Sequence, residues 1–233
     1  MAERSMVKSR NVAQQLIKDG IVYINGKKAD KSSLSVSSED VIEIRGELPK
    51  YVGRGGYKLE GAVKEFGITL EGKVCIDVGA STGGFTDCML QNGASLVYAV
   101  DVGSNQLDSS LRADNRVVSL ENTDIRSARG VIKEKADFIG ADVSFISLKL
   151  VLPEIKELLQ DCGEAVVLIK PQFEVGKKGL GKNGIVKDRF LREKTAEDIR
   201  SFALALGFKV LGTVQSPITG GDGNVEYLMY LSV

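Results

Sequence analysis

The residues best suited to chemistry in this chain stand where apolar runs end. The apolar run Val74–Val78 contains Asp77 and leads into the loop Gly79–Phe85, which reads GASTGGF. Glycine adopts conformations that other residues disfavour and lets backbone N–H groups approach a ligand closely. The spacing Gly-x-x-x-Gly-Gly differs from the dinucleotide fingerprint, and no Gly-Lys-Ser/Thr of a phosphate-binding loop follows it. The loop therefore indicates either a ligand that is not held by its phosphates or a turn formed for packing alone.

Further carboxylates follow the later apolar runs. Asp101 ends the next run, where an acid can accept hydrogen bonds from both hydroxyls of a ribose. Asp124 in NTDIR and Asp142 in ADVSFIS follow the two runs after that. Because ligands of parallel sheets bind beyond the carboxyl ends of the strands, these acids are expected to face one crevice. Such a crevice favours a positively charged nucleoside, and S-adenosylmethionine has this character.

The chain contains no histidine. This excludes Ser-His-Asp and Cys-His nucleophile systems and histidine-bound metals, so proton transfer must use lysine, a carboxylate, tyrosine or cysteine. Lys170 follows the apolar run Val166–Ile169 and precedes Pro171, which places it at the same crevice. A lysine can accept a proton where burial or a neighbouring cation disfavours its charged form.

The composition is that of an ordinary globular protein. The 233 residues are 43% hydrophobic and 27% charged. No apolar run approaches the roughly 18 residues of a membrane span, and the start MAERSMVKSR lacks the apolar middle of a signal peptide, so we expect a cytoplasmic protein. Cys75, Cys88 and Cys162 have no disulfide or zinc spacing, and we expect reduced core cysteines and no metal.

Basic residues are concentrated in two segments, although the net charge is +0. Lysine and arginine predominate between residues 1 and 31 and again between 170 and 194. Such segments favour contact with a polyanion, and solvated surface lysines are the alternative interpretation.

The chain divides into two regions of different pattern. Residues 9–18 have helical spacing and are followed by strand-like runs at 21–24 and 41–44, with a tight-turn signal at Asn25-Gly26. Residues 46–56 carry a proline and several glycines and are expected to form a linker. Beyond them, apolar runs alternate with helix-like stretches such as 85–92, 148–159 and 189–206. This alternation predicts an α/β fold with a mostly parallel sheet covered on both faces, closed by a hairpin of the last two strands.

At this point the sequence resembles the TlyA (haemolysin A-like) ribosomal RNA methyltransferases, which join an S4 RNA-binding domain to an FtsJ-type methyltransferase domain. The resemblance covers nearly the whole chain and rests on KSRNVAQQLIKDGIVYINGKKADK, YVGRGGYKLEGA, DVGASTGGFTD, VDVGSNQL, ADVSFISL, IKPQFEVGKKG and NVEYLMYL. It implies a Rossmann-like class I methyltransferase sheet in residues 57–233, a linker at 47–56 and a small α+β S4-like domain at 1–46. The first helix usual in that domain is missing from this sequence, so we expect a shortened domain.

The resemblance also implies an activity, which is the transfer of a methyl group from S-adenosylmethionine to a ribose 2′-hydroxyl of ribosomal RNA, on cytidine. The catalytic tetrad of FtsJ-type enzymes carries over to Lys58, Asp142, Lys170 and Glu226. The cofactor-binding residues carry over to Asp77, Gly79, Ala80, Ser81, Gly83, Gly84, Phe85, Asp101, Val102, Asp124, Ile125 and Asp142. The residues expected to bind RNA, in free ribosomal RNA or in ribosomal subunits, are Lys8, Arg10, Lys18, Lys27, Lys28, Arg54, Lys177, Lys178 and Lys182.

Other functions remain open at this stage. An RNA-binding or regulatory protein could retain the methyltransferase fold without catalysis, but the intact set of acids and lysines argues against it. A small-molecule methyltransferase is compatible with the second region alone, because a fold does not determine its substrate. A membrane-active haemolysin finds no support in an apolar span or a strongly amphipathic basic helix.

Overall fold

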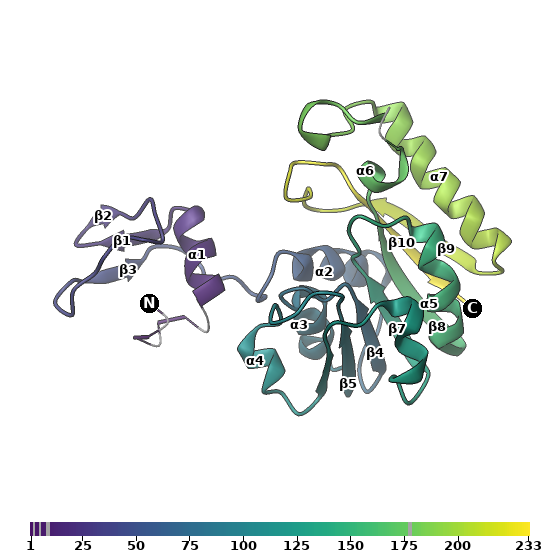
Figure 1. The fold of residues 1–233 in the computed structure, drawn as a ribbon, viewed down its shortest axis with the longest axis horizontal. Helices are drawn as coiled ribbons and strands as arrows, with labels where there is room; N and C mark the ends of the chain where they lie inside the picture. Colours follow the sequence, from purple (N-terminus) through teal and green to yellow (C-terminus); the bar gives the residue numbers. More distant parts are fainter. Residues whose placement is uncertain (2, 5, 8–9, 177–178) are drawn as a thin grey trace.

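The computed structural model describes residues 1, 3–4, 6–7, 10–176 and 179–233. Figure 1 shows a small N-terminal lobe and a larger lobe in which a sheet is covered by helices on both faces. The part of the chain described here includes no helix that is both long and apolar enough to cross a membrane.

The small lobe packs one helix against a short sheet. Its elements are α1 Arg10–Lys18, β1 Val22–Ile24, β2 Lys27–Lys28 and β3 Ile42–Ile44. Among the described residues the sheet has three antiparallel strands in the order β2-β1-β3. Asn25 and Gly26 both have positive φ, as a tight turn between antiparallel strands requires, and they join β1 to β2. The strand β2 is not indicated by the sequence because both of its residues are lysines.

The larger lobe is built on a mixed sheet that confirms the predicted α/β fold. Within the described residues it has seven strands in the order β6-β5-β4-β7-β8-β10-β9. The strands β4 to β8 are parallel, and β10 runs antiparallel between β8 and β9. The bounds are β4 Val74–Val78, β5 Leu96–Val100, β6 Val117–Leu120, β7 Ala136–Ala141, β8 Leu159–Ile169, β9 Lys209–Gln215 and β10 Tyr227–Ser232.

Successive residues of the strands supply the cores on the two faces of this sheet. Phe138 packs toward α2 and α3, whereas its neighbour Ile139 packs toward α5 and α7, as the two-residue period of a strand requires. The helices of this lobe are α2 Gly55–Phe66, α3 Gly84–Gln91, α4 Ser109–Arg112, α5 Leu152–Leu158, α6 Pro171–Glu174 and α7 Arg189–Ala205, with short 3₁₀ turns at η1 Ile125–Gly130, η2 Leu148–Leu150 and η4 Lys182–Gly184.

Two expectations differ from the structure in detail. The helix expected over 148–159 is divided into η2 and α5, with Pro153 in the first turn of α5, because proline lacks the N–H that would continue a helix from η2. Cys75 and Cys88 are buried, and burial raises the pKa of each thiol to about 12. Cys162 is exposed instead of lying in the core, because it belongs to the exposed first part of β8.

The expected linker is largely packed onto the larger lobe. Tyr51 is buried in the core beneath α2, and Gly55 and Gly56 are the first residues of that helix. A Cβ at Gly56 would lie 2.3 Å from Cγ of Tyr51, so only glycine allows this approach.

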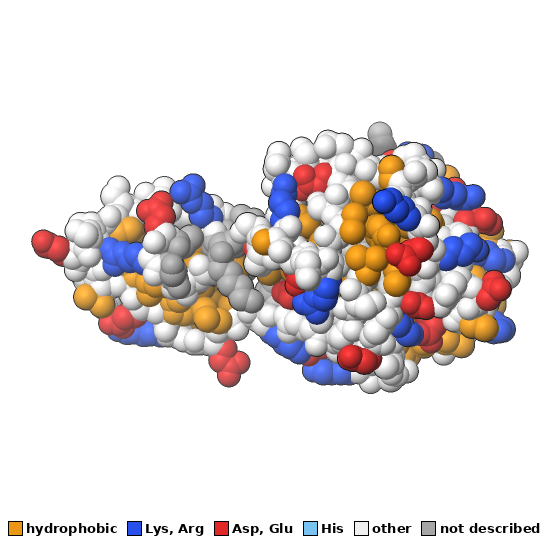
Figure 2. Space-filling model, turned by 90° about the horizontal axis from the view of Figure 1, so that it is seen from below, with side chains coloured by type: hydrophobic (Ala, Val, Ile, Leu, Met, Phe, Trp, Pro, Cys, Tyr) orange, Lys and Arg blue, Asp and Glu red, His pale blue; other side chains and the backbone are white. Residues whose placement is uncertain are grey.

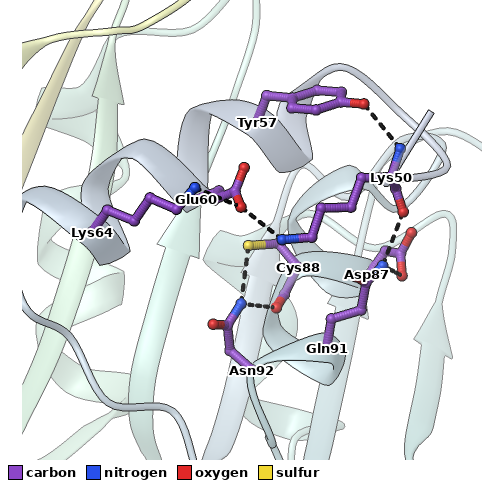
Figure 3. Close-up of polar contacts among 8 residues, drawn as sticks. All are labelled: Lys50, Tyr57, Glu60, Lys64, Asp87, Cys88, Gln91 and Asn92. Carbon is purple, nitrogen blue, oxygen red and sulfur yellow. Dashed lines mark hydrogen bonds and ion pairs between the residues drawn. The ribbon is translucent and has the colours of Figure 1, made fainter. Parts of the chain in front are cut away.

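Lys50 attaches the same segment to the helices beneath it. Figure 3 shows it between α2 and α3: its backbone N–H donates to Oη of Tyr57 at 2.9 Å, its carbonyl accepts from Gln91 at 3.0 Å, and its ammonium lies 2.6 Å from Glu60. These contacts hold Lys50 between α2 and the end of α3. The backbone N–H of Val52 donates to Oδ2 of Asp87, in the first turn of α3, at 2.8 Å, which holds the same segment beside the end of the glycine loop.

Candidate active site

The residues of the expected tetrad converge at one edge of the large sheet. Asp142 directly follows β7, and Lys170 directly follows β8. Glu226 directly precedes β10, and because β10 is antiparallel, its first residues lie beside the last residues of β8. Lys58 reaches this edge from α2. The strand directions therefore bring together residues that are widely separated in the sequence.

The tetrad forms a continuous chain of ion pairs. Nζ of Lys58 lies 2.7 Å from Oε2 of Glu226 and 3.7 Å from Oδ2 of Asp142. Nζ of Lys170 lies 2.6 Å from Oδ1 of Asp142. Lys58 and Lys170 are 7% and 8% exposed, and Glu226 is 2% exposed. Charges so deeply buried are tolerated only when they are paired, and here two ammonium groups balance two carboxylates.

A neutral side chain forms a hydrogen bond at each end of this chain of ion pairs. The ammonium of Lys170 also donates to Oγ of Ser144 at 2.8 Å. At the other end, Nε2 of Gln172 donates to Oε1 of Glu226 at 3.1 Å. We did not identify either residue from the sequence, although both lie inside the motifs ADVSFIS and IKPQF.

A cleft beside the tetrad runs across the ends of β4, β5 and β7. Its larger part has a volume of about 480 Å³, and a smaller part of about 210 Å³ extends to Lys170. The two parts share Gly79, Ser81, Asp142 and Ser144, so one ligand can extend from the larger part toward the tetrad. The expected cofactor residues that line the cleft are Asp77, Gly79, Ala80, Ser81, Gly84, Phe85, Asp101, Val102, Asp124, Ile125 and Asp142.

Two glycines of the loop are required by its geometry. Gly79 has a φ of 83°, and a Cβ there would lie 2.6 Å from the carbonyl oxygen of Asp142. Gly83 has a φ of 94°, and a Cβ there would lie 2.2 Å from Cδ1 of Leu111. Gly83 thus shapes the turn into α3 rather than lining the cleft, whereas Gly79 leaves bare backbone at the floor of the cleft.

Asp77 lies at the bottom of the smaller part of the cleft. Its Oδ2 accepts hydrogen bonds from the backbone N–H and the hydroxyl of Thr86, at 2.8 and 2.6 Å. Its Oδ1 is buried and has no hydrogen-bond partner among the described residues. Burial raises the pKa of this carboxyl to about 7. A buried carboxylate oxygen without a partner suits a ligand that brings a positive charge or a hydrogen-bond donor.

Asp101 and Asp124 occupy different environments along the larger part of the cleft. Asp101 accepts backbone hydrogen bonds from Ser81 and Gly103, both at 2.7 Å, and so joins the glycine loop to the loop after β5. Asp124 pairs with Arg126 at 2.6 Å, and this guanidinium lowers the pKa of the carboxyl. A ligand would have to share Asp124 with Arg126.

An aromatic pair at the mouth of the cleft was also not identified from the sequence. Phe145 lines the cleft, is 90% exposed and has a φ of 63°, in the left-handed region that bulky residues rarely adopt. Its ring lies 4.9 Å from that of Phe173, centroid to centroid. The sequence signal for this pair is that each residue lies three positions after a tetrad member.

The residues expected to bind RNA are only partly covered by the structure. Lys8, Lys177 and Lys178 lie outside the described residues, as does the side chain of Lys182 in η4. Arg10 and Lys18 are on α1, Lys27 and Lys28 form the exposed strand β2, and Arg54 donates to the carbonyl of Thr219 at 3.1 Å. On the face shown in Figure 2, lysine and arginine are interspersed with acidic side chains on both lobes. RNA binding by these residues therefore stays a prediction.

Comparison with known protein families matches both parts of the chain. A family described as FtsJ-like methyltransferase matches residues 51–233, and the S4 domain matches residues 1–42.

Individual relatives are similar over nearly the whole chain. A Mycobacterium tuberculosis protein named 16S/23S rRNA (cytidine-2′-O)-methyltransferase TlyA is 42% identical over 99% of this chain and 87% of its own length. Hemolysin A of Brachyspira hyodysenteriae is 45% identical over 97% of this chain and 94% of its own length. A solved structure from Streptococcus thermophilus, provisionally titled a hemolysin, is 45% identical and superposes with a TM-score of 0.80 over 97% of this chain and 84% of its own.

Proposed function

Because the chain belongs to the FtsJ-like methyltransferase family, we propose that it transfers a methyl group from S-adenosylmethionine to a ribose 2′-hydroxyl of ribosomal RNA. The observation that carries this proposal is the chain of buried ion pairs formed by Lys58, Asp142, Lys170 and Glu226 next to the glycine loop. The name of the Mycobacterium tuberculosis relative supports cytidine as the nucleoside that is modified.

Several independent features of the cleft suit this cofactor. Gly79 leaves room for close approach to the backbone, and Asp101 lines the cleft where it can accept ribose hydroxyls. Oδ1 of Asp77, in the smaller part of the cleft, has no hydrogen-bond partner within the described part of the chain. When bound, S-adenosylmethionine supplies a methyl group on a positively charged sulfur, and carboxylates along the cleft complement that charge. We propose that the residues lining the two parts of the cleft would hold the cofactor.

Lys170 is the residue we propose to act on the attacking hydroxyl. It lines the smaller part of the cleft, whereas Lys58 lies behind it and pairs with Glu226. An ammonium group has three N–H donors. Lys170 donates one to Oγ of Ser144 and is held by the ion pair with Asp142, and we propose that a remaining N–H faces a substrate oxygen. In its neutral form, Nζ of Lys170 takes the proton of the 2′-hydroxyl, and the ammonium that results is held by Asp142.

The other members of the tetrad would keep Lys170 in place. Asp142 lies between the two lysines and fixes Nζ of Lys170 by a direct ion pair. Lys58 and Glu226 anchor Asp142 from the other side, and their burial excludes water from the lysine. Positioning the nucleophile and relieving it of its proton are the main tasks in an in-line transfer of this kind.

We propose that residues 1–46 form an S4-like RNA-binding domain that delivers ribosomal RNA to a catalytic domain of residues 57–233, and that the connecting segment 47–56 is held against the catalytic domain by the packing of Tyr51 and α2. Support comes from the match of the S4 domain to residues 1–42 and from the exposed lysines of β2. Contacts of lysine and arginine with phosphates position a protein on RNA without reading much sequence.

The reaction can be tested with radiolabelled S-adenosylmethionine and ribosomal subunits from cells that lack this protein, followed by alkaline hydrolysis of the RNA. A 2′-O-methyl group removes the hydroxyl that attacks the adjacent phosphate, so we expect the label in alkali-resistant dinucleotides. Label in mononucleotides would indicate base methylation and contradict the role proposed for Lys170, and unlabelled RNA would contradict the substrate.

A further inference from the structure

We propose that Ser144 and Gln172 are positioning residues that hold the two ends of the tetrad, so that the working unit is a chain of six side chains instead of four. This inference rests on the proposed function, because it assigns roles in that same reaction. In space, the contacts run in the order Ser144, Lys170, Asp142, Lys58, Glu226 and Gln172.

Ser144 determines where the ammonium of Lys170 points. Its hydroxyl lies 2.8 Å from Nζ of Lys170 and lines both parts of the cleft. Asp142 alone would allow Lys170 to swing about a single ion pair. A second acceptor removes that freedom and directs the remaining N–H, or the lone pair of the neutral amine, toward the cleft.

Gln172 holds Glu226 in a corresponding way, as a hydrogen-bond donor. Its amide N–H₂ donates to Oε1 of Glu226, while Oε2 of the same carboxylate holds Lys58. The opposite orientation of the amide would place its oxygen against the carboxylate, so the negative charge determines which way Gln172 points. In this orientation Oε1 of Gln172 is buried without a hydrogen-bond partner among the described residues. A buried orphan oxygen costs free energy, which the bond to Glu226 must offset.

Glu226 is also confined on its third side. A Cβ at Gly220 would lie 2.5 Å from Oε1 of Glu226, so the carboxylate packs directly against that backbone. Because the backbone at Gly220 closes this side, Glu226 can shift only toward the space that loss of the Gln172 side chain would open, and such a shift would weaken its ion pair with Lys58.

The sequence places each neutral residue two positions after a tetrad member. Ser144 follows Asp142, and Gln172 follows Lys170, so each of the two strand-end segments supplies one charged and one neutral member of the chain. Both neutral groups bind a charged partner without adding net charge to a buried site whose charges already cancel. A further lysine or carboxylate at either position would instead add an unbalanced charge to the buried site.

The test compares purified variants in the subunit methylation assay. Removal of one hydrogen bond to a charged group by Ser144→Ala or Gln172→Ala is expected to lower kcat by roughly 10-fold to 100-fold, with little change in KM for the RNA or in Kd for S-adenosylmethionine. Ser144→Thr retains the hydroxyl and is expected to restore most of kcat. Gln172→Glu places a second carboxylate against Glu226 and is expected to be worse than Gln172→Ala, which a role in packing alone would not produce.

Matched controls are available at the far end of the sheet. Gln160→Ala removes a glutamine–carboxylate hydrogen bond to Asp137, and Ser95→Ala removes a hydroxyl that donates to the carbonyl of Gly72 at 2.8 Å. Both are expected to leave kcat unchanged. A second readout does not depend on activity: in NMR spectra of ¹⁵N-lysine-labelled protein, Ser144→Ala should move the Nζ signal of Lys170, and Gln172→Ala should move that of Lys58.

The outcomes separate the two proposals. Wild-type protein that places no methyl group on ribose would overturn the proposed function and this inference with it. An active wild type, with variants at Ser144 and Gln172 that retain full kcat or lose it only through weaker cofactor binding, would overturn the positioning roles alone.

Discussion

The carboxylate of Glu226 lies 2.7 Å from the ammonium of Lys58, although 168 residues separate them in the chain. The antiparallel direction of β10 brings its first residues to the edge where the parallel strands end, and α2 supplies the lysine to the same point. Both side chains are more than nine-tenths buried, so each ion is the main compensation for the other.

Removing only one member of this pair should therefore destabilise the protein. Lys58→Met leaves the charge of Glu226 with Gln172 as its remaining hydrogen-bond partner among the described residues. We expect a loss of about 3–5 kcal/mol in the free energy of unfolding, measured by urea denaturation. The double variant Lys58→Met with Glu226→Gln should lose less, because no unpaired charge stays buried. Equal losses in the single and double variants would contradict this account of the pair.

Gly79 and Gly67 form a matched pair for testing the glycine loop. Both have positive φ, but a Cβ at Gly67 would meet no atom of the described residues within 4 Å, whereas one at Gly79 would lie 2.6 Å from the carbonyl oxygen of Asp142. We expect Gly67→Ala to cost about 1 kcal/mol of stability and to leave cofactor binding intact. Gly79→Ala should displace Asp142 and weaken S-adenosylmethionine binding strongly in isothermal titration calorimetry, and similar Kd values for the two variants would oppose this interpretation.

Asp77 should make stability depend on pH. Burial raises the pKa of its carboxyl to about 7, so between about pH 4 and 7 the folded protein binds a proton that the unfolded chain releases. The contribution of this group to stability is therefore complete below about pH 4 and falls as the pH rises toward 7. Urea denaturation of the cofactor-free protein at several pH values should show that the free energy of unfolding declines less between about pH 4 and 7 in Asp77→Asn than in wild type. Asp161→Asn, at an exposed position, should show the same decline as wild type.

Much of the larger lobe can be predicted from the sequence, because strands and their ends are marked by local patterns of residues. Apolar runs of strand length show where strands end, so the local pattern is enough to place Asp101, Asp142 and Lys170 at the edge of the sheet. Lys58 and Glu226 carry no such signal, because the first is a lysine near a glycine-rich segment and the second a charge at a strand start. Their meeting depends on how distant elements pack, and the resemblance to a family was needed to name them.

Other details follow from tertiary contacts that the local sequence does not show. Pro49 and the glycines of residues 46–56 are typical of a linker. Tyr51 is nevertheless buried in the core, because Gly56 has no side chain that would clash with its ring. Ser144 and Gln172 are ordinary polar residues in the sequence, and only the positions of Lys170 and Glu226 give them a role.

The measurement that tests the central claim most directly is the nucleoside composition of ribosomal RNA after incubation of subunits with S-adenosylmethionine and either wild type or Lys170→Met, analysed by mass spectrometry. Methionine keeps the length of the side chain and removes the amine, and Lys64→Met on the exposed face of α2 serves as the control. We expect 2′-O-methylcytidine with wild type and Lys64→Met, and a decrease of roughly 100-fold or more with Lys170→Met at an unchanged Kd for the cofactor. Near wild-type methylation by Lys170→Met, or a methyl group on the base, would contradict the account.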